Sequence, residues 1–407
     1  MKKLFSLLLA CMMLFLTACN QTPPNETTTG NSSNQGTSSD SELKDTIIRN
    51  GYSDFIDLPS RVLFKSGKIF YYSKADGKAY VYCFDPLCDH SGGKCFANPR
   101  DDKNIFHAEF RSTFFINNRF YVVADYGQIF SMAFDGSDVK IEYGEESYIS
   151  QDLNYNLWSQ NYVACSKYIY IPTSLDENEK YNLLRFNTET KEMENLTEKT
   201  GNFMHPKFFY NGEVYGKGER YQGWYKANLD MKNMEPIEEP KMSNQFYGSA
   251  FFNNAYDSET YSPDRKVLGI KVYDMKTRET TILTNEILGL EAYAYEVIDI
   301  DENYVYFYQW EEIEIGKDQK NRPVENNSGG KLYRVKHDGT ECVCIFNDPS
   351  FDFIGREAVV TGNKIIIEGH SVGMRDGYAD TWDSGLKVGT IGKDGKIEKF
   401  ENIELVY

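Results

Sequence analysis

The sequence predicts an all-β protein: a single β-propeller of seven four-stranded blades, with six or eight blades as alternatives. Three observations support this prediction. The 407 residues include 30 Tyr and 26 Phe, and aromatic side chains suit half-buried strands. A short strand–turn–strand pattern recurs along the chain at an average spacing of about 49 residues. Almost no long segment has the 3.6-residue apolar period of an amphipathic helix.

The recurring pattern is an apolar residue, a short turn and a hydrophobic strand. We interpret each copy as the first and second strands of one blade. A second hairpin follows before the next copy begins, which gives four antiparallel strands per repeat. The seven copies are FKSGKIFYY (64–72), FINNRFYVV (115–123), VACSKYIYI (163–171), FYNGEVYGK (209–217), FYGSAFFNN (246–254), DIDENYVYF (299–307) and VTGNKIIIE (360–368).

Turn chemistry and burial both favour a closed ring of such repeats. The Asp-Gly pairs at 135–136, 338–339 and 394–395 supply the positive φ that tight hairpins need. A four-stranded sheet has two apolar faces and cannot shield both from water, whereas sheets arranged in a ring cover one another. The segment KDTIIRNG (44–51) is a candidate closing strand. Tandem β-sandwiches are the alternative architecture.

Residues 1–18 are predicted to be a lipoprotein signal peptide. Two lysines follow the first methionine, and the apolar run at 4–16 is shorter than the about twenty residues that span a bilayer. The stretch LTAC that follows resembles the lipobox of bacterial lipoproteins. This resemblance implies that Cys19 is the first mature residue and carries fatty acyl chains such as palmitate. An ordinary signal peptide cut near Ala18 is the alternative.

Residues 19–42 are predicted to be a lipid-anchored disordered tether, and residues 43–407 the propeller domain. The segment 20–40 contains no large apolar side chain, so burial cannot offset the entropy cost of ordering it. The expected location is the extracytoplasmic face of the cell membrane. The formal net charge of −17 disfavours nucleic acid as a partner, because like charges repel.

The segment YCFDPLCDHSGGKC (82–95) concentrates metal-binding side chains. Three thiols and one imidazole match the ligand set of a zinc site. Four protein ligands would leave no open position on the metal, so such a zinc ion would be structural. A disulfide, which is favoured outside the cytoplasm, and unmodified thiols are the alternatives. The candidate ligands are Cys83, Cys88, His90 and Cys95.

The repeat pattern predicts where this segment lies in the fold. Phe84-Asp85 aligns with Phe134-Asp135 of the next repeat. Cys83 is therefore predicted to end the third strand of the first blade, and the residues after it to form an enlarged hairpin turn at the rim of the ring.

The stretch Gly369-His370-Ser371-Val372-Gly373 has the G-x-S-x-G form of a hydrolase nucleophile elbow. Two facts argue against that function. The residues that follow contain three helix breakers and no apolar stripe, and no histidine follows His370. We interpret the stretch as a loop between two propeller strands.

The other titratable residues form no catalytic pattern in the sequence. The acidic segment Asp299–Glu302 lacks the glycine and the distal glutamate of an EF-hand loop, which favours a solvated turn over a calcium site. The remaining mature-chain histidines outside the cysteine segment are isolated and are expected to pack in the core or lie on the surface. They are His107, His205 and His337.

The lipobox, the polar tether, the aromatic-rich repeats and the DPLCDH stretch (85–90) together resemble β-propeller lipoproteins of Gram-positive bacteria. That group is related to a domain-of-unknown-function family with TolB-like repeats. The resemblance implies a propeller fold and a location outside the membrane. It implies no activity, because none is assigned to that family.

The sequence therefore predicts a non-catalytic binding or scaffold module for a peptide, glycan or membrane-protein partner. It would act as a monomer attached to the membrane through its N-terminal lipid. An extracellular enzyme acting on polysaccharide or peptide is the alternative, since catalytic residues from different blades leave no linear motif. A metal-handling lipoprotein is a second alternative, and it rests on the cysteine segment alone.

Overall fold

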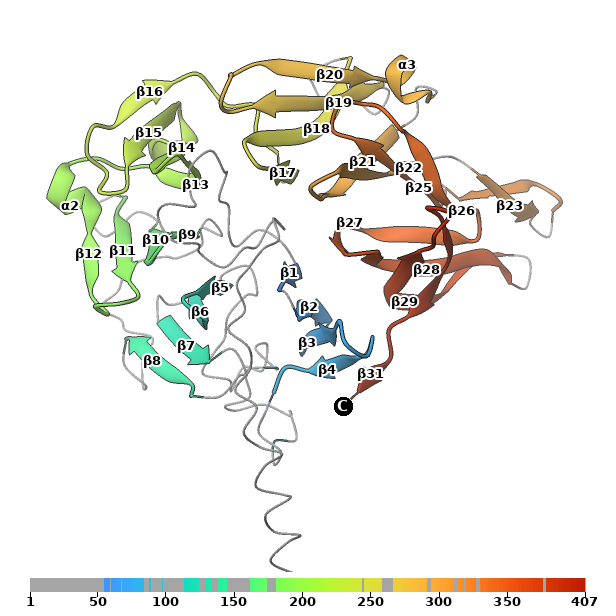
Figure 1. Ribbon diagram of the computed structural model, residues 1–407, viewed down its shortest axis with the longest axis horizontal. Coiled ribbons are helices and arrows are strands. Elements are labelled where there is room, and N and C mark those ends of the chain that lie inside the picture. The colour runs from blue at the N-terminus through green and yellow to red at the C-terminus, as the bar shows by residue number, and fades with distance from the viewer. Residues whose placement is uncertain are drawn as a thin grey trace, which may run out of the picture.

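The computed structural model is a ring of short antiparallel sheets (Figure 1). Its described helices are short: α2 (Leu196–Thr200), α3 (Asn285–Leu288) and the 3₁₀ helix η2 (Glu219–Tyr221). None of the helices in this described part is long and apolar enough to cross a bilayer. The structure describes residues 55–406 apart from 59, 67, 84–87, 89–96, 98–112, 124–128, 134–137, 145–161, 174–180, 244, 258–265, 291–293, 311–312, 318–319, 327–329 and 376–377.

Seven blade sheets follow one another along the chain, and each contains four antiparallel strands in sequence order. The strands of blades 1 to 4 are β1 (Phe55–Asp57), β2 (Arg61–Ser66), β3 (Lys68–Ser73), β4 (Ala79–Val81); β5 (Thr113–Ile116), β6 (Arg119–Val123), β7 (Ile129–Ala133), β8 (Lys140–Tyr143); β9 (Val163–Cys165), β10 (Tyr168–Pro172), β11 (Leu183–Asn187), β12 (Met193–Asn195); and β13 (His205–Tyr210), β14 (Glu213–Lys217), β15 (Trp224–Asn228), β16 (Glu235–Ile237).

Blades 5 to 7 have the same arrangement, and a two-stranded hairpin, β23 (Ile313–Lys317) with β24 (Pro323–Asn326), is inserted into blade 6. Their blade strands are β17 (Gln245–Tyr247), β18 (Ala250–Tyr256), β19 (Val267–Asp274), β20 (Thr280–Thr284); β21 (Ala294–Ile300), β22 (Tyr304–Trp310), β25 (Gly330–Lys336), β26 (Val343–Asp348); and β27 (Phe351–Thr361), β28 (Lys364–Arg375), β29 (Tyr378–Ile391), β30 (Ile397–Asn402).

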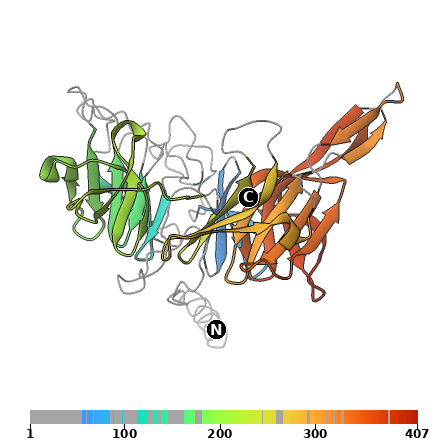
Figure 2. The same cartoon turned by 90° about the horizontal axis from the view of Figure 1, so that it is seen from above.

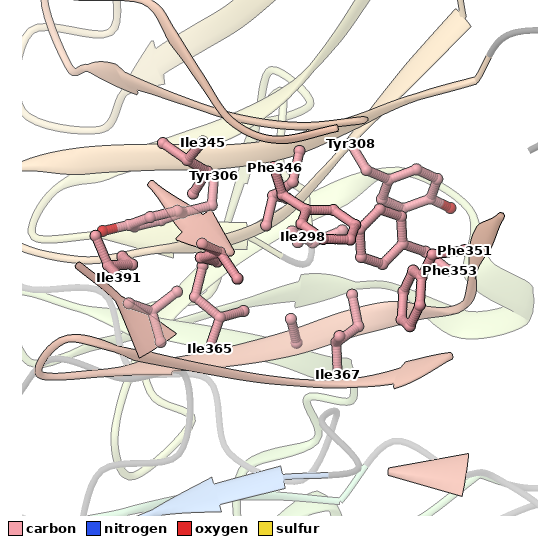
Figure 3. Close-up of a cluster of buried hydrophobic side chains, with 14 residues drawn as sticks. Ile298, Tyr306, Tyr308, Ile345, Phe346, Phe351, Phe353, Ile365, Ile367 and Ile391 are labelled. Atoms are coloured by element: carbon pink, nitrogen blue, oxygen red, sulfur yellow. The ribbon is translucent and has the colours of Figure 1, made fainter. Parts of the chain in front are cut away.

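Each blade buries one face against the next. The seven hydrophobic clusters formed by the described residues each join two neighbouring blades. Figure 3 shows the cluster between blades 6 and 7, where the rings of Tyr308 and Phe353 lie 5.5 Å apart. Val62 and Ile366 belong to the cluster that joins blade 1 to blade 7. The ring is therefore closed, and the predicted seven-bladed propeller is confirmed.

The C-terminal end of the chain joins the outer edge of blade 1. Strand β31 (Leu405–Val406) pairs in parallel with β4 and becomes the fifth strand of that sheet. The ring is thus closed by main-chain hydrogen bonding between the last strand and the first blade as well as by side-chain packing. The predicted closing segment 44–51 lies outside the described residues.

Six of the seven repeat copies form the first and second strands of a blade, as predicted, including the copy at 246–254. The prediction for blade 1 is wrong by one strand. The copy at 64–72 lies on β2 and β3, and β1 precedes it as the strand that contacts β27 of blade 7. The reason is that β1 is only three residues long and leads into Leu58-Pro59-Ser60, which contains no turn glycine or asparagine.

The tight turns use the residues that the sequence predicts. Gly339 and Gly395, each in an Asp-Gly pair, have φ values of 85° and 78°. Gly362, in the turn between β27 and β28, has a φ of 60°. Such conformations strain residues that carry a Cβ atom, so glycine stabilises these hairpins. The pair at 135–136 lies outside the described residues.

Candidate functional site

The connections between strands differ strongly between the two faces of the ring. The turns from first to second strand and from third to fourth strand lie on one face, the turn face, and span two to six residues. The strand ends that are joined by the connections from second to third strand and from blade to blade lie on the opposite face, the loop face. The long connections that start and end there are 82–112, 144–162, 173–182 and 257–266, most of whose residues fall outside the described part of the chain. Long connections on a rigid scaffold are where binding residues concentrate, so the loop face is the candidate functional surface.

An arm projects from this surface at blades 6 and 7 (Figure 2). It consists of two hairpins. One is β23–β24, and the other is formed by the part of β28 after Ser371 and the part of β29 before Trp382, where β28 no longer pairs with β27. The two hairpins contact each other, and the side chain of Met374 lies against Gly316. The arm therefore extends the loop face beyond the body of the propeller.

An exposed indole lies at the base of the arm. Trp382 of β29 is 43% exposed, and its ring lies over Gly373 of the neighbouring strand, with Cη2 2.8 Å from where a Cβ atom of that residue would be. The lack of a side chain at Gly373 lets the ring lie on the strand. Trp224, by contrast, is 5% exposed in the core. Trp382 is thus an aromatic platform available to a ligand.

A carboxylate–imidazole pair lies at the loop-face end of blade 7. Asp352 of β27 and His370 of β28 are directly opposite each other in the sheet, with Oδ2 and Nε2 3.2 Å apart. Both side chains are mostly buried, at 13% and 15% exposed. Phe351 and Phe353 pack toward blade 6, so the alternation of a strand places Asp352 on the face toward blade 1. Such a pair can orient an imidazole for proton transfer.

The stretch Gly369–Gly373 is not a loop, contrary to the prediction, because it lies inside strand β28. The rejection of a nucleophile elbow is confirmed, since no sharp turn leads from it into a helix. Ser371 is paired with Phe351, which faces blade 6, and cross-strand partners share one face. Ser371 and His370 therefore point to opposite faces and cannot form a serine–histidine pair.

The cysteine segment begins elsewhere than predicted. Cys83 follows β4, the fourth strand of blade 1, so residues 82–112 connect blade 1 to blade 2 and are not a hairpin turn within blade 1. Cys83 and Cys88 are half-buried and pack beside the cluster that contains Ala97. The other two candidate ligands, His90 and Cys95, and the predicted lipidation site, Cys19, lie outside the described residues.

The described residues contain no group of three or more His, Cys, Asp and Glu side chains arranged to hold a metal ion. The acidic segment that was expected to be a solvated turn is only partly so. Asp301 accepts hydrogen bonds from Asn303 N and Tyr304 N, which forms the turn. Asp299, however, is 5% exposed in β21 and accepts a hydrogen bond from Val360 N.

The sequence matches no known family and no curated protein. Among solved structures, it is similar to an oligogalacturonate lyase from Vibrio parahaemolyticus, with 10% identity, a TM-score of 0.45, and coverage of 86% of this chain and 89% of that chain. A prolyl endopeptidase matches with 10% identity and a TM-score of 0.39 over 70% of this chain and 40% of its own. A putative TolB from Agrobacterium tumefaciens matches with 12% identity and a TM-score of 0.28, over 65% and 83%.

These similarities concern the propeller fold alone. The chain spans less than half the length of the prolyl endopeptidase it matches. At such low identities no substrate or activity of these proteins applies to this chain, and its function has to be argued from its own residues.

Proposed function

We propose that the protein is a non-catalytic surface receptor or scaffold whose loop face binds a peptide, glycan or membrane-protein partner. The observation that supports this proposal is that, among the described residues, the arm and the strand ends from which the long connections leave lie on one face of the ring. On the opposite face the turns span only two to six residues, so that face presents few loop residues to a partner. The lipid on Cys19 would hold the protein at the extracytoplasmic face of the membrane.

Photo-crosslinking in intact cells tests this function. A photoreactive amino acid placed at Trp382, on the loop face, should capture a consistent partner. The same amino acid placed at Lys393, an exposed residue in the turn between β29 and β30 on the turn face, is the matched control and should capture none. Equal capture from both positions, or capture only from Lys393, would contradict the proposal.

The structural zinc ion remains a prediction from the sequence, and it has a direct measurement. If Cys83, Cys88, His90 and Cys95 bind zinc, elemental analysis of the purified protein should give one zinc per chain. A chelator should then release the metal together with three newly reactive thiols. If Cys83, Cys88 and Cys95 all react as free thiols in metal-free protein before chelation, both the zinc site and a disulfide are excluded.

A second function is favoured by the pair of Asp352 and His370. An extracellular enzyme acting on polysaccharide or peptide could use His370 as an acid or base oriented by Asp352. Removing a general acid–base group typically lowers the rate by a factor of about 10² to 10⁴. Turnover of labelled oligosaccharides or fluorogenic peptides by the wild type, lost in His370→Gln, would establish this function; equal turnover by both proteins would exclude this histidine as the catalytic group.

A further inference from the structure

A buried histidine at the loop-face end of blade 4 has no hydrogen-bonding partner among the described residues. His205 begins β13, the innermost strand of that blade, and is 2% exposed. Neither Nδ1 nor Nε2 has a hydrogen bond to a described residue. An imidazole normally hydrogen-bonds when it is buried, so this arrangement requires an explanation.

Three aromatic rings surround this imidazole. The ring of Tyr221 is stacked on it, with centroids 4.2 Å apart and planes 7° apart. Phe203 and Tyr181 are nearly perpendicular to it, with centroids 4.8 Å and 5.6 Å away. Tyr181 precedes β11 in blade 3, and Tyr221 ends η2 between β14 and β15 of blade 4. We call His205 and these three rings the aromatic box. It forms only where blades 3 and 4 meet.

The ring that covers the box is held by a strained loop. Arg220 and Tyr221 have φ values of 51° and 59°, in the left-handed region that strains a residue with a Cβ atom. Gly218 and Gly223 flank the segment and can absorb a change of backbone direction. Tyr221 is itself 46% exposed, so its ring can leave the box without disrupting the core.

We propose that Tyr221 is a lid on a binding site for an aromatic side chain of a peptide, whose ring replaces that of Tyr221 over His205. This inference rests on the proposed function, because it assigns a ligand class to one part of the loop face. Opening the lid would release the strain at Arg220 and Tyr221, while the incoming ring would restore the stacking contact. The exchange therefore costs little, which is what a displaceable lid requires.

The walls of the box favour an aromatic ring over a sugar. Phe203 and the imidazole present ring surfaces, and the hydroxyl groups of a sugar would be desolvated against them. The Nζ atom of Lys207 lies 5.4 Å from the centroid of the Tyr221 ring, so an aromatic replacement would keep this cation–π contact. The net charge of −17 additionally favours peptides with basic residues.

The test uses N-acetyl-phenylalaninamide as the probe and N-acetyl-cyclohexylalaninamide as its saturated control. The imidazole NMR signals of His205 in the whole protein report on binding. The aromatic probe should shift these signals saturably, and Tyr221→Ala should bind it about 10- to 100-fold more tightly, because the competing ring is gone. Ile282→Ala removes an exposed apolar side chain from β20 of blade 5 and should leave the affinity unchanged.

Two results would contradict the proposal that Tyr221 is a displaceable lid. One is an unchanged affinity in Tyr221→Ala, and the other is equal binding of the saturated control. A variant that merely unfolds is recognised because the other imidazole signals would collapse as well. This site and the proposed function can fail separately: probe binding at His205 without loop-face cross-linking in cells would keep the site and contradict the receptor function.

Discussion

Replacing Asp299 with asparagine should raise the free energy of unfolding by about 5 kcal/mol at pH 8 and change it little at pH 4. The carboxyl group lies in the interface between blades 6 and 7, near the axis of the ring, and is 5% exposed. Burial raises its pKa from 3.8 to about 8, even though hydrogen bonds from the backbone of Val360 and Ile300 lower it. The negative charge of Asp57 raises it further.

The sign of the effect follows from which state holds the proton. Between pH 4 and pH 8 the unfolded chain has lost the proton of Asp299 while the folded protein keeps it. The contribution of Asp299 to the stability of the wild type is therefore fully present below pH 4 and is lost as the pH rises toward 8. Asparagine resembles the protonated acid and cannot ionise, and its side-chain oxygen can still accept the bond from Val360 N, which is 2.5 Å long in the wild type.

Urea unfolding of wild type and Asp299→Asn at pH 4, 6 and 8 measures this difference. The difference in the free energy of unfolding between the two proteins should increase steadily with pH. A gap that is the same at pH 4 and pH 8 would show that the buried group does not titrate in this range, and a less stable variant at pH 8 would show that the ionised form is the one stabilised by the fold.

Acidification should destabilise the wild type through His205, by about 3 kcal/mol between pH 6.5 and pH 4. Burial lowers the pKa of this imidazole from 6.5 to about 4, and the nearby charge of Lys207 lowers it further. As the pH falls, the unfolded chain takes up the proton first, so stability is lost across this interval.

His205→Phe should remove this acid sensitivity. A phenyl ring can keep the stacking contact with Tyr221 and cannot be protonated. The difference in unfolding free energy between pH 7 and pH 4 should therefore be smaller in the variant by about 3 kcal/mol. NMR titration of His205 in the wild type gives an independent measurement, and a midpoint near 6.5 would contradict the prediction.

Much of the fold could be predicted because turns and strands carry local signals. Glycine and asparagine at positive φ mark the hairpins, as at Asn211 and Gly212, whose φ values are 54° and 74°. Repetition then gives the number of blades, since each sheet needs a neighbour to cover its apolar faces. The error in blade 1 has a physical cause as well: a turn signal shows that two strands pair, but it does not show which strand lies next to the axis.

The ring cluster around His205 and the burial of Asp299 could not be predicted, because both arise only when blades pack. Tyr181 and His205 belong to different blades, and nothing in their sequence spacing indicates that their rings are 5.6 Å apart. His205 packs in the core, which is one of the two expected positions, yet the sequence carries no sign of the Tyr221 ring stacked on it. Asp299 looked like part of a solvated acidic turn, whereas its burial depends on Val360 of the next blade.

The sequence by itself predicted a ring of four-stranded units, seven in number with six or eight as alternatives, because strand alternation and turn chemistry act between residues close in the chain. Only the tertiary structure decided which strand of blade 1 is innermost, which face carries the long connections, and which titratable groups are removed from water. Desolvation and ring stacking depend on what the neighbouring blade places against a side chain, and that neighbour lies far away in the sequence.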